Sequence, residues 1–395
     1  MKRLTQLSNK EKKNVIGIMS GTSLDGVDVA LVEIEGNSTF TKINLVGFLE
    51  YPFPKGLKNI LLKNSIKETS NVEDLSQLNF LIPNIYSDAI KTLCKEIEFP
   101  FEKIDLIGSH GQTVHHLPVK QNYFDYKIAS TLQIGDPAVL AKLTNIITIG
   151  DFRTGDVALG GEGAPLVPYF DYILFHSHQK NRALLNIGGI SNFTILNKNL
   201  GLQEVLAFDT GPGNMLIDTV TKKLFNKDFD KDGEIARSGK LNNELYKSLI
   251  AKDKFIELTP PKSTGREYYG ESFLADLLKK YKNLPNEDWL NTITRFTAYG
   301  IFKNYELFVK KETVIDELII SGGGAKNKFL YECLSKEFGK SVELKVIDDI
   351  GVSSDAKEAI CFAVLANETI SGNPTNIPRT TGASRATVLG KICLP

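Results

Sequence analysis

Short apolar runs alternate along the chain with segments whose apolar residues recur at helical spacing. Residues 14–20 (NVIGIMS) and 27–34 (VDVALVEI) predict two strands joined by a glycine-containing turn. Residues 72–97 carry Leu, Ile and Phe at helical intervals and predict a long helix. Residues 104–109 predict a buried strand that ends in the loop SHGQT. Strands that alternate with helices predict an α/β sheet covered on both faces.

A similar order of elements starts again in the second half of the chain. Residues 182–187 and 193–196 predict strands joined by GGISN, and residues 205–208 predict a third strand that ends in DTGPGN. A strand, a Gly/Ser/Thr turn and a second strand thus occur twice, about 170 residues apart, which is no solenoid period. The pattern predicts one α/β unit that has been duplicated.

The remaining predicted elements complete both halves. The strands are expected at 39–49, 146–149 and 316–321, and the helices at 55–66, 215–225, 329–338 and 354–370. Ser353 or Ser354 is expected to cap the last helix. The tail from Ser371 is rich in Gly, Pro, Thr and Ser, which predicts a loop.

Composition narrows the possible partners. A length of 395 residues suits two domains, and 42% apolar with 24% charged residues is typical of a globular protein. Basic and acidic residues balance at 47 each, so no net field attracts nucleic acid or an anionic membrane. The polar N-terminus does not resemble a signal peptide, and the scattered cysteines predict reduced thiols in the cytoplasm.

Glycine-rich turns are the first candidate chemistry. Residues 20–26, 188–192 and 209–214 each follow a predicted strand, and glycine lets backbone N–H groups approach a phosphate. The turn at 209–214 also precedes a helix, whose N-terminus favours anions. Residues 321–327 (SGGGAKN) could let an adenosine lie against bare backbone. The alternatives are ordinary turns and close packing of a helix on a strand. No Walker A motif is present.

Charged residues near these turns are the next candidates. Asp209 ends an apolar strand, where a carboxylate can accept a proton or hold magnesium through water; the alternative is a helix cap. Of Asp25 and Asp28, one is expected to face the magnesium water shell and the other solvent. Arg153 could orient a polar substrate through its planar fork, or pair with Asp151 or Asp156.

Glu358, near the start of the last predicted helix, could reach a sugar hydroxyl. Its spacing favours a solvated helix residue.

A series of motifs resembles the anhydro-N-acetylmuramic acid kinase family. They run in family order from Ile16 to Ser384: GIMSGTSLDGVDVAL, IGSHGQTVHH, LQIGDPAVLA, DFRTGDVALGGEGAPLVP, LNIGGISN, FDTGPGN, FDKDG, PKSTGRE, SGGGAKN and TGAS. The resemblance implies an α/β fold of two RNase H-like (actin/hexokinase/Hsp70-type) domains with a central ATP and substrate cleft. The expected N-terminal domain is 1–145 with 372–395, and the expected C-terminal domain is 146–371.

The same resemblance implies an activity. ATP would phosphorylate O6 of 1,6-anhydro-N-acetylmuramic acid while water opens the 1,6-anhydro bond, giving N-acetylmuramic acid 6-phosphate for cell-wall recycling. The expected cofactors are ATP and Mg²⁺, and the expected partners are the anhydrosugar and, in a homodimer, a second copy of the chain.

The resemblance also implies roles for single residues. Asp209 matches the catalytic base, and Gln112, Thr113, Arg153 and Glu358 match or line the sugar site. Asp25 and Asp209 are expected to hold Mg²⁺ through water. The residues expected to bind ATP lie in the glycine-rich segments: Gly21, Thr22, Ser23, Leu24, Asp25, Gly26, Val27, Asp28, Gly188, Gly189, Asn192, Gly211, Gly213, Asn214, Gly322, Gly323, Gly324 and Asn327.

Three other functions stay open from the sequence. A kinase for levoglucosan, the 1,6-anhydride of glucose, would share the fold and mechanism. A non-catalytic ATP-binding scaffold would bind nucleotide without transfer, although FDTGPGN and DFRTGD are both retained. A plain glycoside hydrolase would need no ATP, which the several phosphate-type turns argue against.

Overall fold

The chain folds into two compact units. The computed structural model describes residues 2–21 and 24–395. The N-terminal unit is Met1–Leu174 with Asp355–Pro395, and the C-terminal unit is Phe175–Ser354. These boundaries differ from those expected at 145/146 and 371/372. The reason is that β6 extends the N-terminal sheet and α14 packs on that sheet, so both belong to the N-terminal unit.

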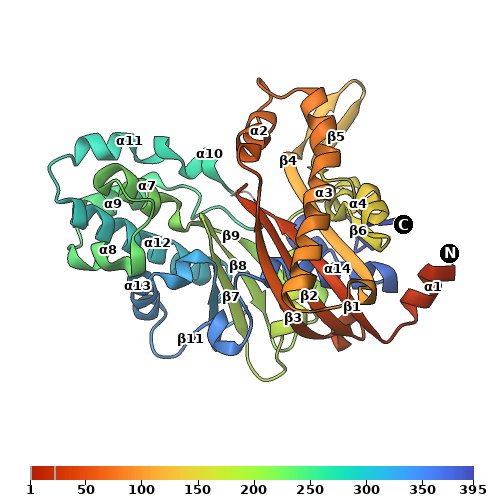
Figure 1. The fold of residues 1–395 in the computed structure, drawn as a ribbon. Coiled ribbons are helices and arrows are strands. Elements are labelled where there is room, and N and C mark those ends of the chain that lie inside the picture. Colours follow the sequence, from red (N-terminus) through yellow and green to blue (C-terminus); the bar gives the residue numbers. More distant parts are fainter. Residues whose placement is uncertain (1, 22–23) are drawn as a thin grey trace. The chain divides into compact units, whose positions relative to one another are not determined.

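The N-terminal unit is built around a sheet with helices on it (Figure 1). Its strands are β1 (Lys12–Ser20), β2 (Gly26–Glu35), β3 (Lys42–Pro52), β4 (Leu106–Tyr123), β5 (Tyr126–Ile134), β6 (Ile147–Gly150) and β12 (Lys391–Cys393). Its helices are α1 (Lys2–Ser8), α2 (Leu57–Asn64), α3 (Val72–Glu96), α4 (Pro137–Thr144), α5 (Phe152–Ala158), α6 (Val167–Phe175), α14 (Lys357–Ser371) and α15 (Pro378–Thr381).

The C-terminal unit has a smaller sheet. Its strands are β7 (Arg182–Ile187), β8 (Ile190–Leu196), β9 (Leu206–Pro212), β10 (Glu317–Ser321) and β11 (Glu343–Val346). Its helices are α7 (Asn214–Phe225), α8 (Glu234–Ser238), α9 (Asn243–Lys252), α10 (Arg266–Tyr269), α11 (Glu271–Lys280), α12 (Asn286–Phe308) and α13 (Lys328–Phe338).

Both sheets have the same strand order. In the N-terminal unit the order is β12-β6-β4-β1-β2-β3, with β5 paired to β4, and in the C-terminal unit it is β11-β10-β7-β8-β9. In each unit three antiparallel strands come first, and two later strands then join parallel to the first. This repeated order confirms the predicted duplication and the RNase H-like fold class.

Two glycines bring α14 onto the N-terminal sheet. Gly17 of β1 and Gly108 of β4 are paired across the sheet. A Cβ on Gly17 would overlap the carbonyl oxygen of Ala359, and one on Gly108 would overlap that of Phe362. The flanking residues Ile16, Ile18 and Ile107 pack on the opposite face, in the core that includes α3. Glycine at both positions thus allows α14 to pack directly on the sheet.

Replacement of Gly108 by Ala is expected to destabilise the N-terminal unit by at least ~1–3 kcal/mol, because a methyl group would force helix backbone away from the sheet. Urea unfolding measures the change. Gly155→Ala is the matched control, since the first atom its Cβ meets is the flexible Leu389 Cδ2 at 3.4 Å. Equal stability of the two variants would contradict this account of α14.

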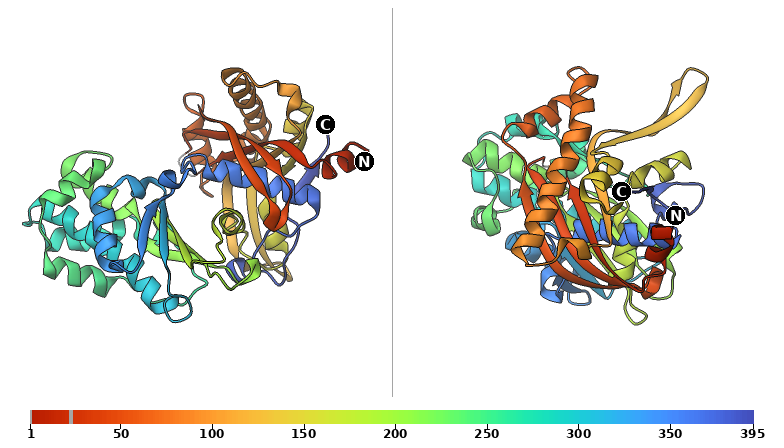
Figure 2. Two further views of the ribbon diagram at one scale, coloured as in Figure 1. Left: turned by 90° about the horizontal axis from the view of Figure 1, so that it is seen from below. Right: turned by 45° about the vertical axis from the view of Figure 1, so that its right-hand side comes forward.

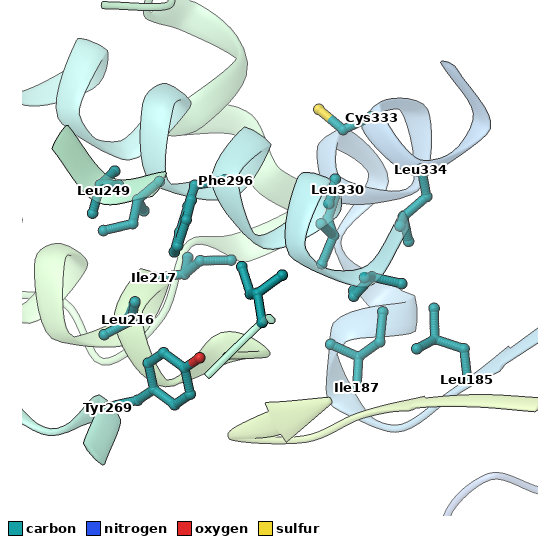
Figure 3. Packing of buried hydrophobic residues seen from close by; sticks show 14 of the residues in the cluster. Leu185, Ile187, Leu216, Ile217, Leu249, Tyr269, Phe296, Leu330, Cys333 and Leu334 are labelled. Atoms are coloured by element: carbon teal, nitrogen blue, oxygen red, sulfur yellow. The ribbon is translucent and has the colours of Figure 1, made fainter. Parts of the chain in front are cut away.

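The core of the C-terminal unit lies between its sheet and α7, α12 and α13. Figure 3 shows Leu185 and Ile187 of β7 near Leu330 and Leu334 of α13, and Leu216 and Ile217 of α7 near Phe296 of α12. These residues are buried almost completely. This face of the sheet is therefore apolar and covered.

Three local predictions were wrong. The expected SHGQT loop is part of β4, which continues to Tyr123 and forms a long hairpin with β5 (Figure 2). The tail after Ser371 contains α15 and β12, and β12 pairs with β6. Helix α14 begins at Lys357 after Ala356, so neither Ser353 nor Ser354 caps it.

In the described part of the chain, no helix combines the length and the hydropathy that a membrane span requires.

Candidate active site

A row of polar residues crosses the C-terminal sheet. Ser321 of β10 pairs with Asn186 of β7, Asn186 pairs with Asn192 of β8, and Asn192 pairs with Asp209 of β9. Directly paired residues point to the same face of a sheet. Their chain neighbours, such as Phe193 and Phe208, are buried in the core on the other side. The row lies near the carboxyl ends of the parallel strands, where α/β sheets bind ligands.

Asp209 is held in place by the segment that precedes α10. Its Oδ2 accepts a hydrogen bond from the Thr264 backbone N–H at 2.9 Å, and its own N–H donates to the Lys262 carbonyl oxygen at 3.1 Å. The residue at the N-cap of α7 is Gly213. Asp209 is therefore no helix cap, and the structure presents it as an oriented carboxylate at the edge of the sheet.

The turn before α7 is joined to the turn between β7 and β8. The N–H groups of Gly213 and Met215 donate to the Gly189 carbonyl oxygen at 2.9 and 3.0 Å, and that of Asn214 donates to the Gly188 carbonyl oxygen at 2.8 Å. The start of α7 thus directs these N–H groups at protein carbonyls instead of at a phosphate. A Cβ on Gly213 would overlap the Gly188 oxygen, so packing of the two turns also requires this glycine.

Other predicted glycines differ in the space around them. Gly322 has φ +80°, and a Cβ on Gly324 would overlap Ile187, so close packing explains both. Gly211 has φ +126° and lies against Tyr269. Three others have room beside the backbone, with no tight contact at a Cβ position: Gly21, Gly188 and Gly323. These three positions suit the approach of a ligand.

Asn327 has a structural role in the C-terminal unit. Its side-chain oxygen accepts from the Leu330 N–H at 3.0 Å and caps α13. The oxygen keeps a second lone pair and the amide nitrogen has two donors, so contact of Asn327 with a nucleotide stays a prediction.

The turn between β1 and β2 carries the other predicted phosphate-binding segment. Thr22 and Ser23 lie outside the described residues. Leu24 and Val27 are buried in the core, so only their backbone groups could meet a ligand. Asp25 is exposed, whereas Asp28 of β2 is half-buried. The two carboxylates thus differ in exposure, and which of them faces a magnesium water shell stays a prediction.

Gln112 connects this turn to β4. Its Oε1 accepts from Ser20 Oγ at 2.5 Å, and its Nε2 donates to the Gly21 carbonyl oxygen at 3.4 Å. Both side chains are buried. Thr113, the next residue, accepts from Gln133 Nε2 at 3.1 Å through its hydroxyl. The structure therefore brings Gln112 to the start of the predicted phosphate-binding turn, while Thr113 contacts the β5 side of the hairpin.

Arg153 is fixed by His110, which the sequence did not indicate. The guanidinium Nε and Nη2 lie 3.1 and 3.0 Å from His110 Nε2, and Nη1 donates to the Gly163 carbonyl oxygen at 2.7 Å. His110 Nδ1 lies 2.9 Å from the Gly111 carbonyl oxygen. A carbonyl can only accept, so Nδ1 carries the proton and Nε2 accepts from Arg153.

The expected alternative for Arg153, a surface ion pair, is wrong. Asp151 pairs with Lys391 at 2.8 Å. Asp156 is buried and accepts from Asn376 and Thr381, each at 2.7 Å. With three of its five N–H groups used in the contacts above, Arg153 keeps two that can bind a ligand.

His110 is expected to stay neutral between about pH 5 and 8 in the folded protein, where a free histidine would titrate. Burial, followed by the nearby Arg153 charge, lowers the pKa of His110 to about 3. Nitrogen NMR of the ring should show the Nδ1–H tautomer unchanged across this range. The urea-unfolded chain is the control, because there the ring should titrate near ~6.5. Titration near that value in the folded protein would show that His110 does not accept from Arg153.

The charges of several carboxylates act on Asp28. Burial, and after it the charges of Glu50, Glu358, Asp25 and Asp355 in that order of effect, together raise the pKa of Asp28 to about 7. A carboxyl group that titrates near neutrality can exchange protons at physiological pH. Among the described residues, no group of three or more His, Cys, Asp and Glu side chains has an arrangement that could hold a metal ion.

Glu358 lies on the first turn of α14, where it is exposed. The surrounding protein still desolvates its carboxyl group, which raises the pKa of Glu358. Its contact with a sugar hydroxyl stays a prediction. The charge of Glu358 also acts on Asp28 and on Arg153. Glu358 thus lies within electrostatic reach of both Asp28 and Arg153.

Known proteins resemble the chain over its whole length. The sequence description of the family "Anhydro-N-acetylmuramic acid kinase" matches residues 13–395. The protein of that name from Caldanaerobacter subterraneus is 45% identical over 398 residues, covering 100% of both chains. That from Bacillus cereus strain 03BB102 is 47% identical over 382 residues, covering 96% of this chain and 99% of the relative.

Similarity to solved structures is lower. A ROK hexokinase from Thermus thermophilus is 13% identical with a TM-score of 0.35, and covers 90% of this chain and 98% of its own.

Proposed function

Because the chain belongs to the anhydro-N-acetylmuramic acid kinase family and is thus a sugar kinase, we propose a reaction with two coupled parts. Water opens the 1,6-anhydro bond of 1,6-anhydro-N-acetylmuramic acid, and ATP phosphorylates the released O6. The products are N-acetylmuramic acid 6-phosphate and ADP. A role in peptidoglycan recycling in the cytoplasm, by a homodimer, belongs to the same proposal.

The orientation of Asp209 is the observation that carries this proposal. Its carboxylate is held by the Thr264 N–H on the polar row of the C-terminal sheet. In the proposed step, Asp209 accepts a proton from water, the water oxygen bonds to C1, and the C1–O6 bond breaks. O6 bonds to the γ-phosphorus of ATP as the bond to ADP breaks. An inverting glycosidase needs a second carboxyl group to protonate the leaving oxygen. Here the phosphoryl group captures that oxygen, so one base suffices.

Arg153 supports the muramic substrate over levoglucosan. The lactyl group of the muramic sugar carries a carboxylate, which levoglucosan lacks, and a planar guanidinium is suited to bind a carboxylate. The His110 and Gly163 contacts hold the guanidinium in one orientation and leave two N–H groups for a ligand. We assign sugar binding to Arg153. We also assign it to Gln112, Thr113 and Glu358, the other residues that the sequence predicts at the sugar site.

ATP and Mg²⁺ fit the available donors in different ways. The backbone around Gly21, Gly188 and Gly323 is open enough for close approach of a nucleotide. Mg²⁺ usually takes one or two carboxylates together with water and substrate phosphates, so it needs no cluster of three protein ligands. Asp25 and Asp209 are the carboxylates proposed to hold it through water. When bound, Mg²⁺ neutralises phosphate charge.

An assay of ADP release with Mg-ATP tests the proposed substrate. The chain should release ADP with 1,6-anhydro-N-acetylmuramic acid, with formation of a 6-phosphosugar, and little without sugar. If ADP is released with levoglucosan but not with the muramic sugar, levoglucosan is the substrate and the proposed substrate is wrong. Binding of Mg-ATP, seen as raised thermal stability, without ADP release from any sugar would favour the non-catalytic scaffold.

A further inference from the structure

Lys262 lies in a cage of aromatic rings and backbone carbonyls in the C-terminal unit. Its Nζ donates to the carbonyl oxygens of Phe255 and Ile256, each at 3.1 Å. The same atom lies 4.8 Å from the ring centroids of Phe255 and Phe308, and 5.9 Å from that of Phe208. An ammonium group over aromatic faces is held electrostatically, and more strongly when partly desolvated.

The backbone next to Lys262 contacts Asp209 on two sides. The Lys262 carbonyl oxygen accepts from the Asp209 N–H, and the Thr264 N–H donates to Asp209 Oδ2. Phe208, one ring of the cage, directly precedes Asp209 on β9. The segment that orients the carboxylate is thus anchored by the Lys262 side chain to the residues that follow α9.

Two carboxylates act electrostatically on the Lys262 ammonium. Asp253 follows α9 and is buried, where it accepts from the Tyr269 hydroxyl at 2.8 and 3.0 Å, and Asp209 lies on β9. The rings contributed by β9, α12 and the residues after α9 are neutral. Burial lowers the pKa of Lys262, and the two carboxylates oppose this decrease. The net pKa is about 8, so the side chain is mostly cationic at pH 7.

We propose that Lys262 is a positioning residue for Asp209, whose cationic side chain fixes residues 262–264 so that the carboxylate is oriented to accept a proton from water. The inference rests on the proposed role of Asp209 as the base. A misplacement of about 1 Å can cost ~10²-fold in rate. A neutral side chain at position 262 would leave two carbonyls without their donor and release the segment.

The test compares Lys262→Met, which keeps the chain length, with Lys262→Arg, which keeps the charge. Lys262→Met should lower kcat by ~10–100-fold, with KM for sugar and ATP changed by less than about threefold. The acidic limb of its pH–kcat profile should move to higher pH, because a cation that favours the carboxylate is lost. Lys262→Arg should restore most of kcat. Lys254→Met, an exposed lysine of the same segment, is the control and should behave as the unmodified chain.

A double mutant separates positioning from general stability. Single-turnover rates of Asp209→Asn and of Asp209→Asn with Lys262→Met should be equal, since Lys262 acts through Asp209. An additive loss, or a Lys262→Met kcat equal to that of Lys254→Met, overturns the inference. If Lys262→Met does not fold, Phe308→Leu takes its place, because it removes one ring of the cage. Phe308→Leu should lower kcat by less than Lys262→Met, and should not lower the rate further when combined with Asp209→Asn. A further loss in that double mutant overturns the inference. Near-normal turnover by Asp209→Asn alone would instead contradict the proposed function.

Discussion

Asp209→Asn is expected to lower turnover by ~10²–10⁴-fold, the range in which general-base action contributes to catalysis. The amide has nearly the same shape as the carboxylate and can still accept from the Thr264 N–H, which in the structure binds Oδ2 at 2.9 Å. It cannot accept a proton from water at neutral pH. The loss should therefore appear in kcat, while affinity for Mg-ATP changes little.

Single-turnover kinetics and thermal stabilisation by Mg-ATP measure these two quantities separately. Asp276→Asn is a suitable control, because its side chain on α11 is 84% exposed. Turnover of Asp209→Asn within a fewfold of this control would show that another group is the base. The amide in Asp209→Asn can still contact a metal-bound water, so a loss of Mg-ATP binding as large as the loss of turnover would show that Asp209 acts through the metal and not as the base.

Arg153→Met is expected to lower kcat/KM for the anhydromuramic sugar by about 100-fold or more, because it removes an oriented guanidinium from the sugar. The change also leaves the buried His110 Nε2 without its donor. Arg153→Lys should recover little activity, since an ammonium cannot donate to His110, to the Gly163 carbonyl and to a carboxylate with the same geometry.

The comparison of sugars makes this prediction specific. If Arg153 binds the lactyl carboxylate, the variant should lose activity on the muramic sugar far more than any activity on levoglucosan. Arg385→Met, at an exposed arginine of the same unit, controls for loss of charge. Equal losses on both sugars would contradict a contact with the lactyl group and indicate a structural role.

Strand positions were predicted well where the apolar pattern alone determines them. The expected strands at 14–20, 27–34 and 182–187 correspond to β1, β2 and β7, and the strand after GGISN to β8. The errors occur where a partner distant in sequence decides whether a segment becomes ordered. The residues after 109 are mostly polar and include Pro118, yet they form a strand because β5 pairs with them. The C-terminal tail is ordered by Asp156, a partner more than 200 residues away in sequence.

Prediction of the site residues is limited in the same way, because contacts between residues distant in sequence decide some of their roles. Asp209 and the glycine-rich segments are visible in the sequence because they come directly after apolar runs. The expected end of the strand at Asp209 is wrong, since β9 continues to Pro212. His110 and Lys262 matter through contacts with Arg153 and with the 255–256 carbonyls, which no local spacing reveals. A histidine inside a mostly buried strand and a lysine followed by STG before a helix were the available signals. The helix start at α7 also differs from the expected phosphate site, because its N–H groups are used by Gly188 and Gly189.

The central claim is that water opens the anhydro bond in the same event that phosphorylates O6. Turnover in ¹⁸O-labelled water with ordinary Mg-ATP, quenched early and analysed by mass spectrometry and phosphorus NMR, tests it most directly. The account predicts one ¹⁸O at C1 of the sugar 6-phosphate and none in the phosphoryl group. Label in the phosphoryl group, or a phosphorylated sugar whose anhydro bond is intact, would contradict it.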